Sequence, residues 1–283
     1  GGLALIIGFF SSIFIILIFK NFDFYTFTQH RIFLTLIFSS IVLFLLGFID
    51  DIFNLSPILR LLFQVLFSSL VWSSGIAIKV IDISFLNLST EYITFSNSIS
   101  LIITIFWIVG LLNAFNWMDG MDGLLAGCAA IYCLGFSIIS YKFGNFDNCY
   151  ISAFLASSLI AFLSKNFDPA KMIMGDGGSN FVGFCLSLIA LKSTQSINLI
   201  SDDMNFLNPI YLLIILFIPI FDMVKVIILR IIKNSSPFYP DRNHLHHQIL
   251  NLGFSHPQVV FIEYFISFSL VIASLIIINI QNV

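Results

Sequence analysis

Long runs of apolar residues alternate with short polar segments along the whole chain. A helix that crosses a bilayer needs roughly 20 apolar residues, and runs of about this length predict nine spanning helices. The predicted spans are Gly2–Phe19, Ile32–Ile49, Leu59–Ile78, Ser98–Asn116, Leu124–Tyr141, Cys149–Ser164, Phe181–Leu191, Leu207–Leu229 and Val259–Ile280. We therefore expect a single all-α, polytopic membrane domain that covers residues 1–283.

One segment between spans has a different pattern. Val80 to Phe95 alternates apolar and polar residues around Leu88, Ser89 and Thr90, which is typical of two short strands. It predicts a short β-hairpin. No internal repeat and no soluble domain is visible in the sequence.

Threading the spans in alternation places the polar clusters on one side of the membrane. That side receives Asp50–Pro57, Trp117–Gly123, Lys165–Ser179, Arg230–Pro257 and the start of the chain. It also carries a small excess of Lys and Arg, so the positive-inside rule favours a cytoplasmic active face and puts the hairpin on the non-cytoplasmic side.

Composition agrees with a membrane protein and excludes other classes. Of the 283 residues, 59% are hydrophobic and 10% are charged, against about 25% charged in soluble domains. A formal net charge of -3 excludes a nucleic-acid partner that binds by counterion release. The four cysteines lack metal-ligand spacing and are interpreted as small apolar residues.

Asp50 and Asp51 directly follow an apolar span. Ionised side chains near the hydrocarbon cost a few kcal/mol unless they are solvated, paired or metal-bound. The pair could act as a base beside a metal site, or it could simply end a helix at the water interface.

The stretch from Asn113 to Gly127 carries an amide or a carboxylate at every third position: Asn113, Asn116, Asp119 and Asp122. In a continuous helix, side chains three residues apart point in directions that differ by about 60°. A break near Gly120 is therefore needed for the four side chains to converge. Such oxygen ligands suit Mg²⁺. A capped helix junction would explain the glycines but not two Asp and two Asn at a membrane boundary.

A glycine-rich segment, Met174 to Ser179, precedes the next predicted span. Its glycines permit a tight turn, and backbone N–H groups at the following helix N-terminus could receive a phosphate. Asp176 is its candidate metal ligand. The segment lacks the Gly-Lys-Ser/Thr of a P-loop.

The longest polar segment gathers Arg242, His244, His246 and His247. Imidazoles and a guanidinium can bind a pyrophosphate and stabilise its developing charge. A zinc site is the alternative because histidine clusters are common zinc ligands, although the nearby carboxylates favour harder oxygen chemistry.

Four motifs together resemble a known family. Asp50-Asp51, the Asn113–Gly127 stretch, Met174–Ser179 and the Pro240–His247 segment occur in the order and spacing of the polyprenyl-phosphate N-acetylhexosamine-1-phosphate transferases, within glycosyltransferase family 4. The His-Leu-His-His form is similar to the WecA/TagO-like branch, which starts O-antigen, enterobacterial common antigen or teichoic acid synthesis.

The resemblance implies an activity and a set of site residues. The reaction would be transfer of a sugar 1-phosphate from a UDP-sugar to polyprenyl (undecaprenyl) phosphate with Mg²⁺, or Mn²⁺ in its place, at the cytoplasmic face of the bacterial inner membrane. A homodimer is left open. By position, the metal ligands are Asn116 and Asp176, the pair that activates the lipid phosphate is Asp50 and Asp51, and the substrate-binding residues are Asp119, Asp122, Asn166, Lys171, Arg242, His244, His246 and His247.

Two positions depart from the family pattern. Ile173 stands where many members have a phenylalanine that can stack on uracil. The chain begins at Gly1-Gly2, where the family has an earlier span and a basic loop, so we expect an N-terminal truncation.

Two other classes of protein compete with the transferase. An ion-coupled secondary transporter also uses intramembrane carboxylates and interrupted helices, but the carboxylates of the motifs cluster at one interface, and Asp222 is the residue taken to lie within a span. A purely structural membrane scaffold would need neither the histidines nor the acidic motifs.

Overall fold

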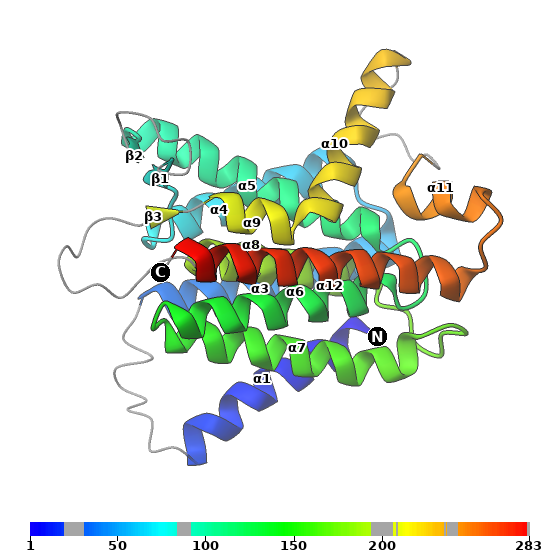
Figure 1. Cartoon of the computed structure of the whole chain (residues 1–283), viewed down its shortest axis with the longest axis horizontal. Coiled ribbons are helices and arrows are strands. Elements are labelled where there is room, and N and C mark those ends of the chain that lie inside the picture. The colour runs from blue at the N-terminus through cyan, green and yellow to red at the C-terminus, as the bar shows by residue number, and fades with distance from the viewer. Residues whose placement is uncertain are drawn as a thin grey trace.

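A bundle of apolar helices, with a small sheet at one end, forms the part of the chain that the structure describes (Figure 1). This computed structural model describes residues 1–19, 31–83, 92–193, 206–207, 209–234, 236 and 243–281. The helices are α1 (Gly2–Phe19), α3 (Arg31–Phe53), α4 (Pro57–Ser73), α5 (Asn97–Met118), α6 (Leu124–Lys142), α7 (Phe146–Asn166), α8 (Gly175–Ser193), α9 (Pro209–Ile215), α10 (Phe217–Ile232), α11 (Leu245–Asn251) and α12 (His256–Gln281).

Every predicted apolar run overlaps a helix, but nine spans are not confirmed. Among the described residues, five helices are long and apolar enough to cross a membrane: α3, α5, α6, α7 and α12. The bent pair of α9 and α10 would make a sixth. By contrast, α1 and α4 are shorter apolar helices, and α8 begins with the polar sequence Gly-Asp-Gly-Gly-Ser-Asn. The chain is thus a multi-pass, helical membrane protein.

The predicted span Leu207–Leu229 is wrong as a single helix. It divides into α9 and α10, which meet at an angle of 79°. Pro219 explains the position of the break, because it has no N–H to donate to the carbonyl of Ile215, the last residue of α9. Leu207 itself lies in a strand.

The predicted hairpin is present as two paired strands. β1 (Val80–Asp82) pairs antiparallel with β2 (Tyr92–Thr94) in the register Val80↔Thr94. A third strand, β3 (Phe206–Leu207), adds to β1 in parallel and was not predicted. The positions Leu88, Ser89 and Thr90 lie outside the described residues.

Helix α8 occupies the centre of the bundle, between α3, α5, α6 and α7 (Figure 1). It is buried along almost its whole length. Gly183 permits the close approach of α5, because a Cβ at this position would lie 3.1 Å from the Cα of Leu112. The helix therefore holds its first turn, which contains Asp176, in a fixed place.

The polar links between helices gather at one end of the bundle, as the alternation of spans predicts. Figure 1 shows the N-terminus, the α5–α6 and α7–α8 links and α11 at the same end, and the small sheet at the opposite end. This common end contains the candidate site.

Candidate active site

The ends of α3 and α5 and the start of α8 meet at one point and bring polar side chains of the site together. Asp176, in the first turn of α8, accepts a hydrogen bond at Oδ1 from Asn116 Nδ2 of α5 at 3.1 Å. Its backbone N–H donates to Asp51 Oδ1, near the end of α3, at 2.9 Å. Gly175 makes this contact possible: its φ is +73°, and a Cβ there would lie 2.7 Å from Asp51 Oδ2.

The two adjacent carboxylates of α3 differ in their surroundings. Asp50 is buried, its Oδ1 accepts from Leu55 N at 2.7 Å, and its Oδ2 lies 2.6 Å from Arg60 Nη1. Arg60 stands one turn into α4, which begins at Pro57 after the Ser56 cap. Asp51 is exposed. Asp50 therefore acts within the structure as a paired charge, and Asp51 is the member of the pair that a ligand can reach.

Asp119 lies in the break between α5 and α6, beside other carboxylates. Burial, followed by the negative charges of Asp176, Asp51 and Asp122, raises its pKa to about 8. Burial also raises the pKa of Asp176, to which Asp50 and Asp51 contribute. Crowded carboxylates of this kind are stabilised by a bound cation.

The chemistry of these side chains fits magnesium. The candidate donors are carboxylate and amide oxygens, and Mg²⁺ typically takes one or two carboxylates plus water and substrate phosphate. Over the described ranges, no group of three His, Cys, Asp or Glu side chains is arranged to hold a metal ion. A structural zinc site needs four protein ligands, and the described residues offer no such group.

The predicted convergence of the four amides and carboxylates is only partial. Asn113 donates to Gln64 Oε1 of α4 at 2.9 Å, away from the cluster. Asp122 accepts from Ala170 N in the α7–α8 link at 3.0 Å. The helix break leaves Asn116 and Asp119 near Asp176, whereas Asn113, one turn earlier on α5, joins α4 instead.

The α7–α8 link is tied to the start of α6 by Asn166. This buried side chain accepts from Gly123 N at 3.1 Å and donates to Met172 O at 2.9 Å. The link leaves Lys171 exposed, and Ile173 is 74% exposed. Asp122 and Asn166 thus shape the link, while Lys171 and Ile173 are open to a ligand.

The histidine segment, His244 to His247, lies against the α5–α6 break. A Cβ on Gly120 would be 2.6 Å from His246 Nε2, so the imidazole rests on the glycine next to Asp119. The rings of His244 and His246 stack at 5.6 Å, and those of His246 and His247 are 4.4 Å apart. Arg242 lies outside the described residues.

His246 is neutral at physiological pH. Burial, followed by the charges of His247 and His244, lowers its pKa to about 3. A neutral imidazole donates one hydrogen bond but carries no positive charge. His246 therefore offers a ligand a hydrogen bond but no positive charge.

Sequence reasoning missed several contacts in the site. Arg60 reaches Asp176 Oδ2 at 3.4 Å across 116 positions of the chain. Asp222 of α10 accepts from His244 Nδ1 at 2.7 Å, and the guanidinium of Arg230 lies 4.8 Å from the ring of Trp117. The available signal was the presence of Asp222 and Arg230 in otherwise apolar α10, because ionisable residues in a span have partners.

Comparisons with known proteins show which family the chain belongs to. The model of "Glycosyl transferase family 4" matches residues 32–194, more than half of the chain, and this range contains the whole acidic cluster. A "probable undecaprenyl-phosphate N-acetylglucosaminyl 1-phosphate transferase" of Bacillus subtilis (strain 168) is 32% identical over 84% of this chain and 64% of its own length. A decaprenyl-phosphate N-acetylglucosaminephosphotransferase of Mycobacterium leprae (strain TN) is 33% identical over 77% of this chain and 58% of its own length.

A third relative, from Haemophilus influenzae (strain ATCC 51907 / DSM 11121 / KW20 / Rd), is 33% identical over 82% of this chain and 64% of its own length. It is an undecaprenyl-phosphate alpha-N-acetylglucosaminyl 1-phosphate transferase. The chain spans about three fifths of the length of these relatives. None of these names supports a transporter. From the match to its family model, the chain belongs to glycosyl transferase family 4.

Proposed function

We propose that this protein transfers an N-acetylhexosamine 1-phosphate from a UDP-sugar to polyprenyl phosphate and releases UMP. The observation that carries the proposal is the group of carboxylates, Asp51, Asp119, Asp122 and Asp176, at one end of a membrane helix bundle. A negatively charged, oxygen-rich site at a membrane boundary suits metal-assisted chemistry on phosphates. UDP-N-acetylglucosamine is the first donor to test, because the relatives act with N-acetylglucosamine.

Asn116, Asp119 and Asp176 would hold Mg²⁺, or Mn²⁺ in its place. When bound, the metal would neutralise the pyrophosphate of the donor. Asp51 is exposed beside Asp176 and would act on the acceptor phosphate. Asp50, paired with Arg60, keeps the end of α3 in position.

The reaction exchanges one P–O bond for another. A phosphate oxygen of the lipid carrier attacks the β-phosphorus of the UDP-sugar, and the bond from that phosphorus to the bridging oxygen breaks. UMP leaves with the bridging oxygen, and the sugar stays on a lipid-linked diphosphate. Lys171, Asp122 and Asn166 would lie near the nucleotide. Asp122 and Asn166 shape the α7–α8 link, and Lys171 is exposed on it.

The histidine segment would close over the donor's diphosphate. His246 rests on Gly120, next to Asp119, and can donate a hydrogen bond in its neutral form. His244, His247 and Arg242 would add further donors. Such donors stabilise charge that develops on the phosphates in the transition state.

The site would face the cytoplasm from the bacterial inner membrane. Arg60, Lys165 and Lys171 lie at the end of the bundle that carries the site, in agreement with the positive-inside rule. The soluble UDP-sugar would enter from water, and the lipid acceptor from the side. The product would begin the synthesis of a cell-surface polysaccharide.

Purified protein in detergent, with Mg²⁺, tests the proposal. UMP should appear from UDP-N-acetylglucosamine only when polyprenyl phosphate is added, together with an equal amount of a lipid-linked sugar diphosphate. Release of UMP without the lipid, or of UDP with it, would refute the transfer. The Asp176→Asn variant serves as the inactive control.

A further inference from the structure

A buried carboxylate lies outside the acidic cluster and faces the histidine segment. Asp222 of α10 is 8% exposed, and His244 is 7% exposed. Asp222 Oδ2 lies 2.7 Å from His244 Nδ1, and Asp222 Oδ1 accepts from the backbone N–H of Leu245 at 2.6 Å. Both oxygens of one side chain thus hold the first two residues of the histidine segment.

The contact determines which ring nitrogen of His244 is protonated. An ionised carboxylate only accepts hydrogen bonds, so Nδ1 of His244 must be the donor. Nε2 is then the nitrogen that remains for a ligand. A carboxylate that orients a histidine through Nδ1–H in this way is a recurring arrangement in enzymes that act through the opposite nitrogen.

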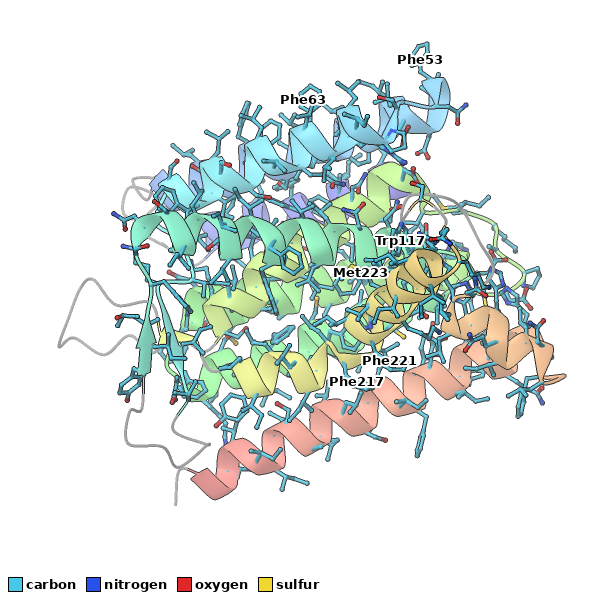
Figure 2. The ribbon with its side chains drawn as sticks, turned by 90° about the horizontal axis from the view of Figure 1, so that it is seen from above. Phe53, Phe63, Trp117, Phe217, Phe221 and Met223 are labelled. Atoms are coloured by element: carbon cyan, nitrogen blue, oxygen red, sulfur yellow. The ribbon has the colours of Figure 1, made fainter. Side chains whose placement is uncertain are left out.

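Other groups fix the plane of the His244 ring. Trp117, at the end of α5, contacts it edge-on at 5.8 Å, and His246 stacks on it at 5.6 Å with the two rings inclined by 5°. Figure 2 shows Trp117 where α5 meets α10, with Met223 on the same stretch of α10. The ring is therefore held by contacts from α5, α10 and its own segment.

We propose that Asp222 is a positioning residue of the transfer reaction: it accepts from Nδ1–H of His244 and stabilises the imidazolium form of the ring, whose Nε2–H donates to the diphosphate of the donor. The inference rests on the proposed function. It adds a residue that neither the sequence motifs nor the acidic cluster includes. Asp222 itself touches neither substrate nor metal in this account.

Two structural roles of Asp222 must be separated from this one. Its Oδ1 caps the backbone of Leu245, and Lys225 Nζ lies 2.9 Å from the same oxygen. In Asp222→Asn the amide oxygen can still accept from Leu245, while the amide nitrogen donates to an unprotonated His244 Nδ1. This favours the neutral ring with its proton on Nε2, which is a weaker donor than the imidazolium. Lys225→Met removes the ion pair and leaves the contact with His244.

Kinetics of these variants test the role of Asp222. Asp222→Asn should lower kcat by on the order of 10- to 100-fold, less than the loss of a whole transition-state donor, with KM for the UDP-sugar nearly unchanged. In a His244→Ala background the same change should cost almost nothing further, because Asp222 acts through His244. Lys225→Met should stay within about threefold of wild type. Fully additive losses, or an equal loss in Lys225→Met, would overturn the inference.

A readout that does not depend on activity separates this inference from the proposed function. In protein with ¹⁵N-labelled histidine rings, the signal missing from His244→Ala identifies His244. Wild type should show a protonated Nδ1, and Asp222→Asn should show a protonated Nε2. An unprotonated Nδ1 in wild type would refute the positioning contact even if transfer is observed. Wild-type protein without lipid-dependent UMP release would refute the transfer, while the ¹⁵N spectrum still decides the contact.

Discussion

Arg60 Nη1 lies 2.6 Å from Asp50 Oδ2, so the first carboxylate of the adjacent acidic pair has its own counter-ion. Asp50 is 6% exposed, and its other oxygen is occupied by the Leu55 N–H. A buried carboxylate that loses such a partner is destabilising, because its charge stays desolvated. Removing the charge of Arg60 is therefore expected to lower the stability of the site.

Arg60→Gln should lower the thermal stability of the protein. A hydrogen bond to a charged group contributes about 1.5–3 kcal/mol, and because Arg60 is about a third exposed we expect the lower end of this range or less. The double variant Asp50→Asn, Arg60→Gln should lose less stability than the two single changes together, since the buried position 50 then carries no unpaired charge. Thermal unfolding in detergent measures all three variants, and strictly additive losses would argue against the pair.

Asp176→Asn should abolish transfer while the protein stays folded. The change keeps the size of the side chain but removes a charge that raises the pKa of Asp119. Without Mg²⁺, the variant should therefore be at least as thermostable as wild type, and added Mg²⁺ should stabilise wild type more than the variant. Turnover and the Mg²⁺-induced shift in Tm are the two measurements. Wild-type turnover in the variant would remove Asp176 from the metal site.

Gly120→Ala should impair the contact between the α5–α6 break and the histidine segment. The new Cβ would lie 2.6 Å from His246 Nε2, which is closer than real Cβ contacts. We expect a loss of activity on the order of tenfold or more, because displacing a positioned group by about 1 Å can cost up to 100-fold. Gly110→Ala, within the preceding helix α5, is the control, since its Cβ would lie 3.7 Å from Met223 Cε. Equal activities of the two variants would contradict the contact.

The sequence predicted the acidic cluster better than the pairings within it. Asp50, Asp51, Asp119 and Asp176 follow or interrupt apolar runs, which marks them as candidate site residues without any knowledge of distances. Arg60 could be placed at the correct end of the bundle but not opposite Asp50 and Asp176. Spacing along the chain carries no information on the packing of α4 against α3 and α8.

For the fold, the sequence likewise predicted where the helices lie but not how they bend and pack. Hydropathy located the helices because lipid demands long apolar runs, but it read Leu207–Leu229 as one span. The bend of 79° between α9 and α10 depends on Pro219 and on packing against α5 and α12. Strand β3 could not be predicted, because two residues give no periodic pattern.

His246 should make the protein less stable at acidic pH. Its pKa is lowered to about 3 in the folded state, against about 6.5 in the unfolded chain. Between these values the unfolded chain binds a proton that the folded chain does not, so the free energy of unfolding rises with pH and is lost as pH falls from about 6.5 towards 3. His246→Gln should reduce the difference in Tm between pH 7 and pH 5, with His256→Gln as the comparison. An unchanged difference would show that His246 does not resist protonation.

The most direct test of the account follows each phosphorus atom of the donor. UDP-N-acetylglucosamine carrying ³²P at the α or at the β position is incubated with the purified protein, Mg²⁺ and polyprenyl phosphate, and the label is counted in the lipid and aqueous phases. Attack at the β-phosphorus predicts that β-label moves into the lipid product while α-label stays in UMP, and that neither moves in Asp176→Asn. Label that stays entirely in water while the sugar enters the lipid, or α-label in the lipid, would contradict transfer of a sugar 1-phosphate.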